Sequence, residues 1–550
     1  MSTAVGRGNV AGVKPEGFRG VFRDDDSARA VYAEGAGIAR AMPAAVAVPD
    51  DADDVATLVR WAAESTTSLI ARGSGSGMAG GAVGPGIIVD LSRIDFIGKI
   101  DTERRRVMVG PGALRGAVNE AARGKQLRFP VDPSSGAFCT IGGMAATNAA
   151  GAHTLRYGAT RAWVTALDCI FDDGSRARIE RGAPLPDVAA VERFLNTAHS
   201  AILAAPARVR SHTGVRKDSS GYALADYARS GELLELLIGS EGTLALFVGI
   251  ELSLAALPGA TSSLVAEFPT LEQAVDGAAR ARIGGASACE LLDRTFIDVA
   301  RSGPALVPID SASEAVLLIE IEAGNAAAAA STAQVMEQAM VSCGATRVTV
   351  ALNSEDEARL WALRHAASPI LNRLSPSLKS MQFIEDTAMP PERLPQYVRG
   401  VREILARHDV RGVIFGHAGD SHVHVNPLID VRSLDWRETV GSILDEVTSL
   451  TAQLGGTLAG EHGDGRLRTP LLERVWDARS VALFAQVKRA FDPQNIFNPG
   501  VKVSTGGNSI DDVKYDPTLP QLPLDARTAL DTIERDRAWS NFRLSMIGGR

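Results

Sequence analysis

The sequence predicts an α+β protein with two differently organised regions. The chain has 550 residues, 45% hydrophobic and 22% charged, the composition of a globular protein long enough for several domains. Before residue 257, short β-branched segments are joined by long loops rich in Gly, Ala and Ser. From Leu257–Ser263 onward the pattern changes to strand–helix–strand units, which are typical of an α+β domain with an antiparallel sheet.

Charge and cysteine content exclude several classes of protein. The 57 basic and 65 acidic residues give a net charge of −8, which argues against nucleic-acid binding. The cysteines form no Cys-x-x-Cys pair, which excludes a zinc ribbon or a ferredoxin-type cluster; they are Cys139, Cys169, Cys289 and Cys343. No apolar run has the length of a signal-peptide core or a membrane span. We therefore expect a cytoplasmic protein, at most peripheral to a membrane.

The first region opens with a polar, Gly-rich lead-in. Asp50 or Asp51 suits the N-cap of the amphipathic helix that follows it. The expected strands are 45–49, 68–71, 87–91, 107–112, a pair around 163–171 with a turn at 172–174, and 245–254; the expected helices are 51–63 and 113–123.

The loop Arg72–Gly81 contains a formal G-x-G-x-x-G at Gly75, Gly77 and Gly80. A dinucleotide site of the Rossmann type needs a helix directly after these glycines, whereas here a strand at 87–91 follows within a few residues. We therefore reject the Rossmann interpretation. The loop is either a flexible turn or a nest whose backbone N–H groups bind a pyrophosphate.

A second unusual stretch is Val131–Ala152, which consists largely of Gly, Ala, Ser and Thr. It shows neither helical nor strand periodicity, and such small side chains cannot fill a core. This composition suits backbone that lies directly against a large flat ligand. Polar loops follow at 217–222 and 237–244.

In the second region, apolar periodicity predicts alternating strands and helices. Leu378–Glu385 is a predicted strand that carries Lys379. The other strands are expected at 263–268, 315–322 and 345–352, and the helices at 271–283, 325–340, 355–374, 391–408, 435–454 and 478–491. A turn-rich segment at 492–500 and a tail at 504–550, partly helical and without recognisable chemistry, complete the chain.

Three of the nine histidines lie within eight positions, in the segment Phe415–Asn426. The apolar residues before it predict a strand, and the residues from His422 onward alternate with a period of two. His422, His424 and Asn426 therefore share one face of a second strand, and His417, at the turn, can fold back towards it. Such a cluster serves packing poorly.

A Gly-rich loop at Gly460–Arg468 adds the adjacent pair Glu461 and His462. Two or three imidazoles and a carboxylate suit Zn or Mn, and one further imidazole can transfer a proton. The remaining histidines that we considered are isolated and are interpreted as ordinary core or surface residues; they are His153, His199, His212 and His408.

Several of these segments together resemble the FAD-linked oxidases of the vanillyl-alcohol oxidase/p-cresol methylhydroxylase superfamily. Within it, the chain looks most like the branch of D-lactate and D-2-hydroxyglutarate dehydrogenases. The motifs that carry the resemblance are RGSGSGMAGG (72–81), the stretch 131–158, KDSSGY (217–222), LIGSEGTL (237–244), GHAGDSHVHVN (416–426), GEHGDGRLR (460–468) and FDPQNIFNPG (491–500).

The resemblance implies a two-part FAD-binding domain of the p-cresol methylhydroxylase type and an α+β substrate domain. The implied arrangement is a lead-in (1–40), an FAD-binding domain (41–257), a substrate domain (258–455), a segment returning to the flavin (456–503) and a tail (504–550). The implied FAD-binding residues are Arg72, Gly73, Ser74, Gly75, Ser76, Gly77, Met78, Pro133, Ser134, Ser135, Gly142, Gly143, Thr147, Asn148, Gly151, Ile238, Gly242 and Asn498.

By the same resemblance, His417, His424 and Glu461 match the family's metal ligands. His422 stands where the family usually has Asn, so it is a fourth ligand, a substrate-orienting group or a neutral replacement. The residues expected at the substrate are Arg364, Ser368, Lys379 and Asn426, although Arg364 and Lys379 could instead form surface ion pairs.

These residues are chemically consistent with oxidation of a D-2-hydroxy acid to its 2-oxo acid. The metal orients the substrate and acidifies its hydroxyl, His462 removes the proton as general base, and hydride leaves C2 for flavin N5. Electrons must pass to an external acceptor, which is a quinone, an electron-transfer flavoprotein or an iron–sulfur partner; a homodimer is compatible with the sequence. The alternatives are a non-redox transferase of the alkylglycerone-phosphate synthase type and a non-catalytic flavin- or metal-binding protein.

Overall fold

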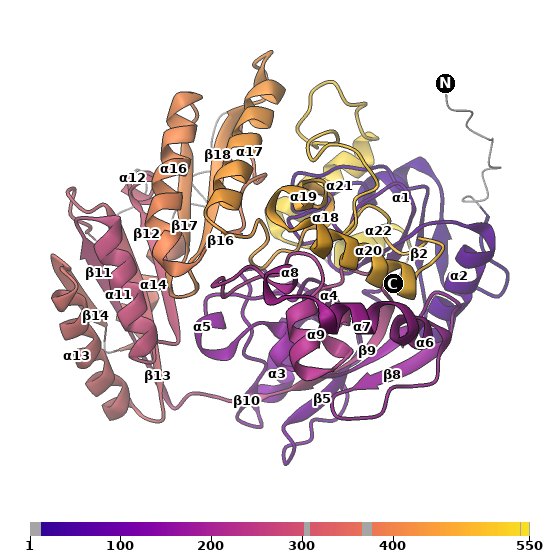
Figure 1. The fold of residues 1–550 in the computed structure, drawn as a ribbon, viewed down its shortest axis with the longest axis horizontal. Helices are drawn as coiled ribbons and strands as arrows, with labels where there is room; N and C mark the ends of the chain where they lie inside the picture. The colour runs from indigo at the N-terminus through magenta and orange to yellow at the C-terminus, as the bar shows by residue number, and fades with distance from the viewer. Residues whose placement is uncertain (1–12, 302–307, 352, 366–376, 540, 549–550) are drawn as a thin grey trace.

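Figure 1 shows the computed structural model of the chain. The structure describes residues 13–301, 308–351, 353–365, 377–539 and 541–548. Within these residues, no helix combines the length and apolar character that a membrane crossing requires.

The first sheet has the order β1-β2-β4-β3, with β2, β4 and β3 parallel. Asp51 caps α2, because its side chain accepts hydrogen bonds from the backbone N–H groups of Asp53 and Asp54, as the sequence predicted. The elements are β1 (Val21–Arg23), α1 (Asp26–Tyr32), β2 (Ala45–Val48), α2 (Ala52–Ser65), β3 (Leu69–Arg72) and β4 (Ile87–Asp90).

A second, antiparallel sheet has the order β5-β9-β7-β8. Its strands are β5 (Arg106–Val109), β7 (Val164–Ile170), β8 (Arg176–Glu180) and β9 (Leu246–Ser253), and a separate pair joins β6 (Leu127–Arg128) to β10 (Ala255–Ala256). The helices of this region are α3 (Arg115–Arg123), α4 (Ile141–Thr147), α5 (Thr154–Tyr157), α6 (Ala189–Phe194), α7 (Ser200–Ala204), α8 (Ala207–Arg210), α9 (Leu224–Ser230) and α10 (Leu234–Leu237), with 3₁₀ and π turns at Thr160–Ala162 and Leu195–His199.

Although the sequence of Val131–Ala152 shows no helical periodicity, part of this stretch is a helix. Within it, α4 forms because Thr140 caps its first turn and Asn148, in the left-handed conformation, ends it. A Gly-Gly-Met-Ala-Ala-Thr segment has too few apolar side chains to show helical periodicity.

The large antiparallel sheet has the order β14-β11-β13-β12-β17-β18-β15, and β16 also pairs with β18. Alternate residues of β11 face opposite layers: Leu264 joins the core beneath α11, α13, α16 and α17, whereas Val265 faces α12 and α14. The strands are β11 (Ala260–Phe268), β12 (Ala288–Asp293), β13 (Ala315–Ala323), β14 (Arg347–Ala351), β15 (Leu378–Ser380), β16 (Thr387–Ala388), β17 (Gly412–His417) and β18 (His422–Asp430). The helices are α11 (Leu271–Ile283), α12 (Arg294–Arg301), α13 (Ala326–Ser342), α14 (Ser354–His365), α16 (Leu394–Arg407), preceded by a 3₁₀ turn at Pro391–Arg393, and α17 (Trp436–Gln453).

In this region two elements were missed, and one sequence-based expectation is wrong. β12 and α12 were not predicted, and the expected strand 378–385 ends at Ser380. The N–H of Met381 still donates to Pro427 of β18, and farther along the carboxylates of Glu385 and Asp386 bind the loop that carries His462.

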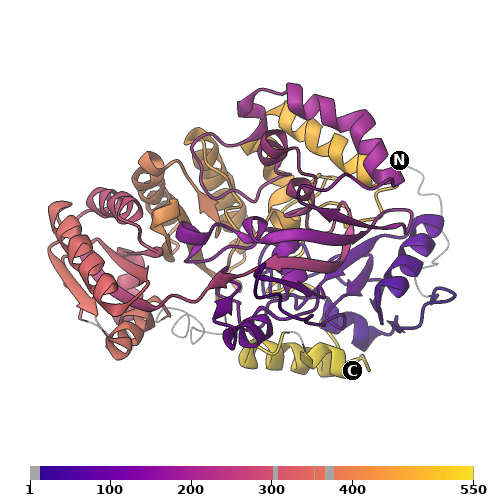
Figure 2. The same cartoon turned by 90° about the horizontal axis from the view of Figure 1, so that it is seen from below.

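The last part of the chain returns to the first region. α20 (Ala478–Phe491) packs beside α6, as Figure 1 shows, and Phe497 pairs with Leu69 of β3. α21 (Leu524–Asp536) packs against α1 (Figure 1), and Figure 2 shows the yellow helix of the tail along one side of the first region. The remaining elements are α18 (Gly465–Arg468), a 3₁₀ turn at Thr469–Leu471, α19 (Leu472–Val475), α21 (Leu524–Asp536) and α22 (Asn541–Met546).

Candidate active site

A cavity of about 1620 Å³ lies where the loop Arg72–Gly81, the stretch Val131–Ala152, the large sheet and the tail meet. Its wall includes the loop after β3, the stretch that contains α4, side chains of β12, β17 and β18, and the loop at Glu461. Drug-sized ligands occupy pockets of roughly 300–1,000 Å³, so this cavity has room for a large ligand together with a small one.

The loop Gly73–Met78 lines one end of the cavity. Among the described residues, no backbone N–H from Gly73 to Met78 donates a hydrogen bond, whereas the carbonyl of Gly75 accepts one from Ala36. Gly75 has φ +77°, a left-handed conformation that glycine adopts without strain. Unpaired N–H groups on a loop of this kind form an anion-binding nest.

The small-residue stretch forms a second wall. A Cβ at Gly151 would lie 2.2 Å from the carbonyl oxygen of Asp132, and a Cβ at Gly142 would lie 2.7 Å from Pro111, so neither position accommodates a side chain. The expected FAD-binding residues that line the cavity are Arg72, Gly73, Ser74, Gly75, Ser76, Gly77, Met78, Pro133, Ser134, Ser135, Gly142, Gly143, Thr147, Gly151 and Gly242.

Three residues expected at the cofactor do not line the cavity. Asn148 ends α4 and accepts a hydrogen bond from the backbone of Arg161, and Ile238 is buried in the core of the second sheet. Asn498 is fully buried and donates to the carbonyls of Gly81 and Glu241. These side chains hold the lining loops in place, a role that motif position alone does not distinguish from ligand contact.

The histidine hairpin presents its polar side chains on one face. His417 pairs with His422, Phe415 with His424 and Val413 with Asn426, and opposite residues of an antiparallel pair point the same way. His417 is the last residue of β17, directly before the turn at Ala418–Asp420, as expected, and its pairing with His422 directs its side chain towards the cluster.

Three imidazoles surround one carboxylate oxygen at the cavity wall. Glu461 Oε1 lies 3.4 Å from His417 Nε2, 3.4 Å from His424 Nε2 and 3.5 Å from His462 Nε2. The Nδ1 atom of each ring has a partner on the other side. Glu290 Oε1 lies 2.5 Å from His417 Nδ1, and the backbone carbonyl of Glu385 accepts a hydrogen bond from His424 Nδ1 at 2.7 Å. The carboxylate of Glu385 contacts His462 Nδ1. All three Nε2 atoms are therefore directed at a common point, as metal ligands require.

His422 takes a different position in this group. Its Nε2 lies 2.8 Å from Asp386 Oδ1, and its Nδ1 has no hydrogen-bond partner within the described part of the chain. One of its nitrogens lies within 4.8 Å of the ligand atoms of His417, His424 and Glu461. Burial and the charge of Lys217 lower the pKa of His422 to about 3, so the ring is neutral. It does not line the cavity, which argues against the expected contact with substrate.

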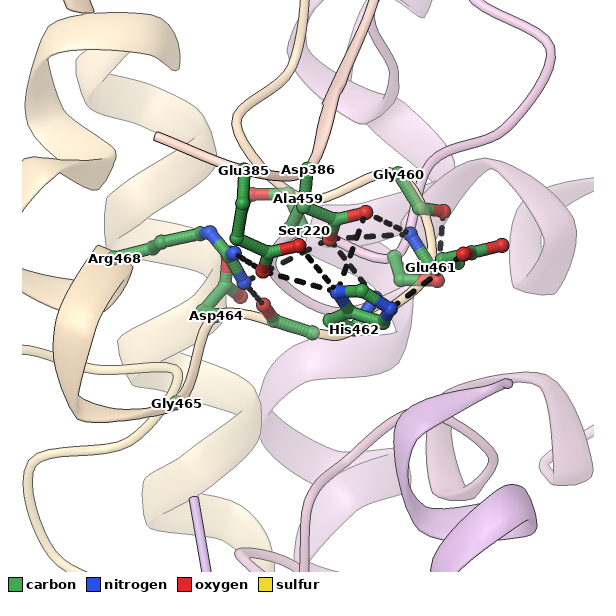
Figure 3. A network of polar contacts seen from close by, with 12 residues as sticks. Ser220, Glu385, Asp386, Ala459, Gly460, Glu461, His462, Asp464, Gly465 and Arg468 are labelled. Atoms are coloured by element: carbon green, nitrogen blue, oxygen red, sulfur yellow. Dashed lines mark hydrogen bonds and ion pairs between the residues drawn. The ribbon is translucent and has the colours of Figure 1, made fainter. Parts of the chain in front are cut away.

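The loop at His462 is fixed by a network of carboxylates and Arg468 (Figure 3). Asp386 accepts hydrogen bonds from the backbone N–H groups of Glu461 and His462, at 3.1 and 2.9 Å. Glu385 pairs with Arg468 and also binds His462 Nδ1. Sequence reasoning missed these three side chains, although the adjacent acidic pair was visible at the end of the strand predicted at 378–385.

The cluster is strongly charged. Lys217 Nζ lies 2.7 Å from Glu461 Oε2, and although burial opposes ionisation, Lys217 and His417 hold the pKa of Glu461 well below its usual range. Burial alone would lower the pKa of His424, but the hydrogen bonds and charges of Glu385 and Glu461 raise it to about 10. A divalent cation would displace the proton from this imidazole.

Arg364 lines the cavity next to the cluster. Its Nε donates to Glu290 Oε2 at 2.8 Å, and its guanidinium lies 4.5 Å from the centre of the Phe415 ring. Glu290 thus bridges Arg364 and His417; the charges of these two partners outweigh burial and lower the pKa of Glu290. Sequence reasoning missed Glu290, because it lies on the unpredicted strand β12.

The other expected substrate residues differ in what the structure shows. Asn426 and Lys379 line the cavity, and Lys379 Nζ lies 5.5 Å from the ring centre of Tyr515 in the tail. Ser368 lies outside the described residues.

His153 was expected to be an ordinary residue, yet it lines the cavity. Asp132 and Glu320 contact its two ring nitrogens at 2.5 and 2.6 Å, and Trp361 stacks on the ring. Burial is outweighed by these two carboxylates, and the pKa of His153 rises to about 11. The imidazolium therefore joins the first region to the large sheet at the cavity wall.

The other histidines considered ordinary are hydrogen-bonded elsewhere: His199 to Tyr227, His212 to Asp218 and His408 to Glu446.

Comparison with known proteins identifies two domains. Residues 43–180 match the FAD binding domain, and residues 257–501 match the C-terminal domain of FAD linked oxidases. The chain is 28% identical over 485 residues to the glycolate oxidase subunit GlcD of Bacillus subtilis, covering 87% of this chain and 93% of that protein. It is 29% identical over 459 residues to the D-lactate dehydrogenase of Archaeoglobus fulgidus, covering 83% and 90%.

A D-2-hydroxyglutarate dehydrogenase of Pseudomonas putida is 28% identical over 563 residues, covering 96% of this chain but 54% of that longer protein. Among solved structures, a 4-ethylphenol oxidase from Gulosibacter chungangensis shares the fold with a TM-score of 0.64 at 15% identity, covering 88% of this chain and 94% of the other. An alkyldihydroxyacetonephosphate synthase also shares the fold, with a TM-score of 0.59 at 15% identity over 87% of this chain and 83% of the other.

Proposed function

The chain belongs to the FAD-linked oxidases, and we propose that it oxidises a D-2-hydroxy acid to the 2-oxo acid with FAD and a divalent metal. The observation that carries the proposal is the convergence of His417, His424 and Glu461 beside His462, in the same cavity as the Gly-rich loops. The relatives named for D-lactate, glycolate and D-2-hydroxyglutarate support this class of small hydroxy-acid substrates.

The residues present fit FAD. The unpaired N–H groups of Gly73–Met78 suit a pyrophosphate, and the wall around Gly142 and Gly151 is bare enough for a flat ring system to lie against it. Bound FAD supplies a two-electron acceptor for the hydride that leaves C2 of the substrate.

The donor set also fits a divalent metal such as Zn or Mn. Two imidazole nitrogens and a carboxylate oxygen leave further positions for a substrate, as catalytic sites do, and a metal there acts as a Lewis acid towards the substrate hydroxyl. His417, His424 and Glu461 would hold it. We assign His422 as a fourth ligand, because Asp386 holds one of its nitrogens and leaves the other without a partner; the substrate would then take a fifth position on the metal.

His462 is the general base in this proposal. Glu385 binds Nδ1, which leaves Nε2 as the acceptor on the cavity side, where it takes the proton of the substrate hydroxyl. Burial is outweighed by the charges of Glu385 and Asp386, which raise the pKa of His462 and so increase the proton affinity of Nε2.

Arg364 and Lys379 would bind substrate carboxylates, with Asn426 beside the metal ligands. Arg364 is not a surface ion pair, since its side chain is 15% exposed and its partner Glu290 is 1% exposed. The guanidinium nitrogens that do not contact Glu290 supply a carboxylate-binding fork.

The test is product formation. Purified protein is incubated with D-lactate, D-2-hydroxyglutarate and glycolate, with the L-enantiomers of the first two as controls, and a soluble dye as electron acceptor. We expect a 2-oxo acid from at least one D-acid and none from its L-enantiomer. FAD-containing protein that forms no 2-oxo acid from any of these compounds would contradict the proposal and favour the transferase alternative, whose solved neighbour shares only the fold.

A further inference from the structure

Two buried arginines lie directly beneath the loop Gly73–Met78. The side chains of Arg72, on β3, and Arg543, on the tail helix α22, are almost completely buried, at 2% and 1% relative exposure. A Cβ added at Gly75 would come within 2.4 Å of Arg72 Nη2 and 2.9 Å of Arg543 Nη1. Both guanidinium groups therefore contact the backbone of this loop from below.

The partners of both guanidinium groups are backbone carbonyls. Arg72 donates to Tyr32 and Ala82 through Nη1 and to Glu34 through Nη2, at 3.0, 3.1 and 2.8 Å. Arg543 donates to Val31 through Nε at 3.1 Å, to Ser74 through Nη1 at 2.8 Å and to Glu34 through Nη2 at 3.3 Å. Within the described chain, neither arginine has a carboxylate at ion-pair distance.

The charges beneath the loop do not balance. Asp90 offsets part of this charge through Tyr32, whose hydroxyl donates to it at 2.7 Å and whose ring lies against both guanidinium groups. Glu534, which also acts on Arg543, is paired with Lys514. The side chain of Glu34 is already paired with Arg527. Burial and then the charge of Arg543 lower the pKa of Arg72 to about 9. Two like charges buried together are costly unless an anion offsets them.

Arg543 also shapes the loop. Its guanidinium donates a hydrogen bond to the carbonyl of Ser74, and the backbone N–H of Ala36 donates one to the carbonyl of Gly75. With these carbonyls paired, the unpaired N–H groups of the loop are available to a ligand in the cavity. A diphosphate bound there would receive these N–H groups and offset the excess positive charge behind them.

We propose that Arg543 is a positioning residue for the FAD pyrophosphate, so that the tail, in which the sequence shows no recognisable chemistry, contributes to the cofactor site. The proposal rests on FAD binding by this family's domain. Arg543 acts through the loop, because it does not itself line the cavity.

The experiment compares apoprotein and FAD-loaded protein of Arg543→Met, Arg543→Lys and Leu544→Ala. Leu544 is fully buried on the same helix and carries no charge, so its truncation loosens the tail without changing the electrostatics of the loop. The readouts are the Kd for FAD, from fluorescence titration of the apoprotein, and the rise in Tm that saturating FAD produces.

We expect Arg543→Met to raise the Kd for FAD by about 10-fold or more, which is what losing one favourable charged contribution implies, and to shrink the FAD-induced rise in Tm. Arg543→Lys should restore part of the affinity, and Leu544→Ala should lower the Tm of the apoprotein while leaving the FAD-induced rise intact. An Arg543→Met protein that binds FAD as tightly as the wild type, or that loses no more affinity than Leu544→Ala, would overturn the proposal. Wild-type protein that binds no FAD would instead refute the cofactor assignment itself.

Discussion

Both carboxylate oxygens of Glu385 lie within hydrogen-bond distance of His462 Nδ1, at 2.9 and 2.8 Å. A carboxylate at this position keeps the proton on Nδ1 and leaves Nε2 as the basic nitrogen. Glu385 is itself held by Arg468, and neither residue belongs to the adjacent pair Glu461–His462 that the sequence singled out. The orientation of the proposed base is thus set from a different segment of the chain.

The first prediction concerns this orientation. Glu385→Gln keeps the shape of the side chain but removes the charge that fixes the tautomer, so we expect flavin reduction to slow by roughly 10–100-fold. His462→Ala should slow it by about 10²-fold or more, with FAD still bound. Rapid-mixing absorbance measures both. The matched control is Glu446→Gln, which removes a glutamate that contacts His408 outside the cavity. A Glu385→Gln enzyme that reduces its flavin at the wild-type rate would remove Glu385 from this role.

The second prediction concerns His422. His422→Asn removes the proposed fourth ligand and should weaken Zn binding by about 10-fold or more, with FAD affinity unchanged. Calorimetric titration of metal-free protein gives the affinity, and the visible spectrum of the Co-substituted protein reports the coordination number. His212→Asn is the control, since His212 is also held by an aspartate but lies away from the cluster. Unchanged affinity and an unchanged Co spectrum would make His422 a structural support for Asp386.

The third prediction concerns substrate binding. Arg364→Lys preserves the positive charge next to Glu290 but loses the planar fork, so we expect KM for the hydroxy acid to rise by roughly 10-fold while kcat changes less. Arg359→Lys, five residues earlier on an exposed part of α14, is the control. If Arg364→Lys left KM at the wild-type value, the carboxylate would have to bind elsewhere.

The fourth prediction concerns pH. The folded-state pKa of His153, about 11, lies above its ordinary value of 6.5. A group with a raised pKa contributes stability that is fully present below the unfolded-state value and is lost as pH rises through the folded-state value. His153→Gln should therefore be most destabilised relative to wild type near pH 6, and the difference should shrink towards pH 11. Urea unfolding at several pH values measures it, and a difference that stays constant or grows with pH would contradict the assignment.

Local patterns in the sequence predicted local features well. The Asp51 cap, the α13 helix after Asn325 and the shared face of His422, His424 and Asn426 depend on residues only a few positions apart. Each has a signal in spacing or capping chemistry that survives folding.

Contacts made over long separations could not be predicted in this way. Glu290 reaches His417 across 127 positions, from a strand that is buried on both faces and so shows no alternation. Arg543 reaches the loop at Ser74 across 469 positions, and nothing in the tail sequence distinguishes it from a surface arginine. For the motif residues Asn148 and Asn498, the sequence predicted contact with the cofactor, but their side chains do not line the cavity. They support the loops that do.

The most direct test of the proposed chemistry is anaerobic bleaching of the flavin spectrum by D-lactate and D-2-hydroxyglutarate, each with its L-enantiomer, before and after chelation of the metal. We predict rapid bleaching by one D-acid, its loss in metal-free protein, and its return when Zn or Mn is restored. Bleaching that persists at the same rate in protein shown to contain no metal would contradict the role of His417, His424 and Glu461. A bound flavin that no hydroxy acid bleaches would contradict the oxidation itself.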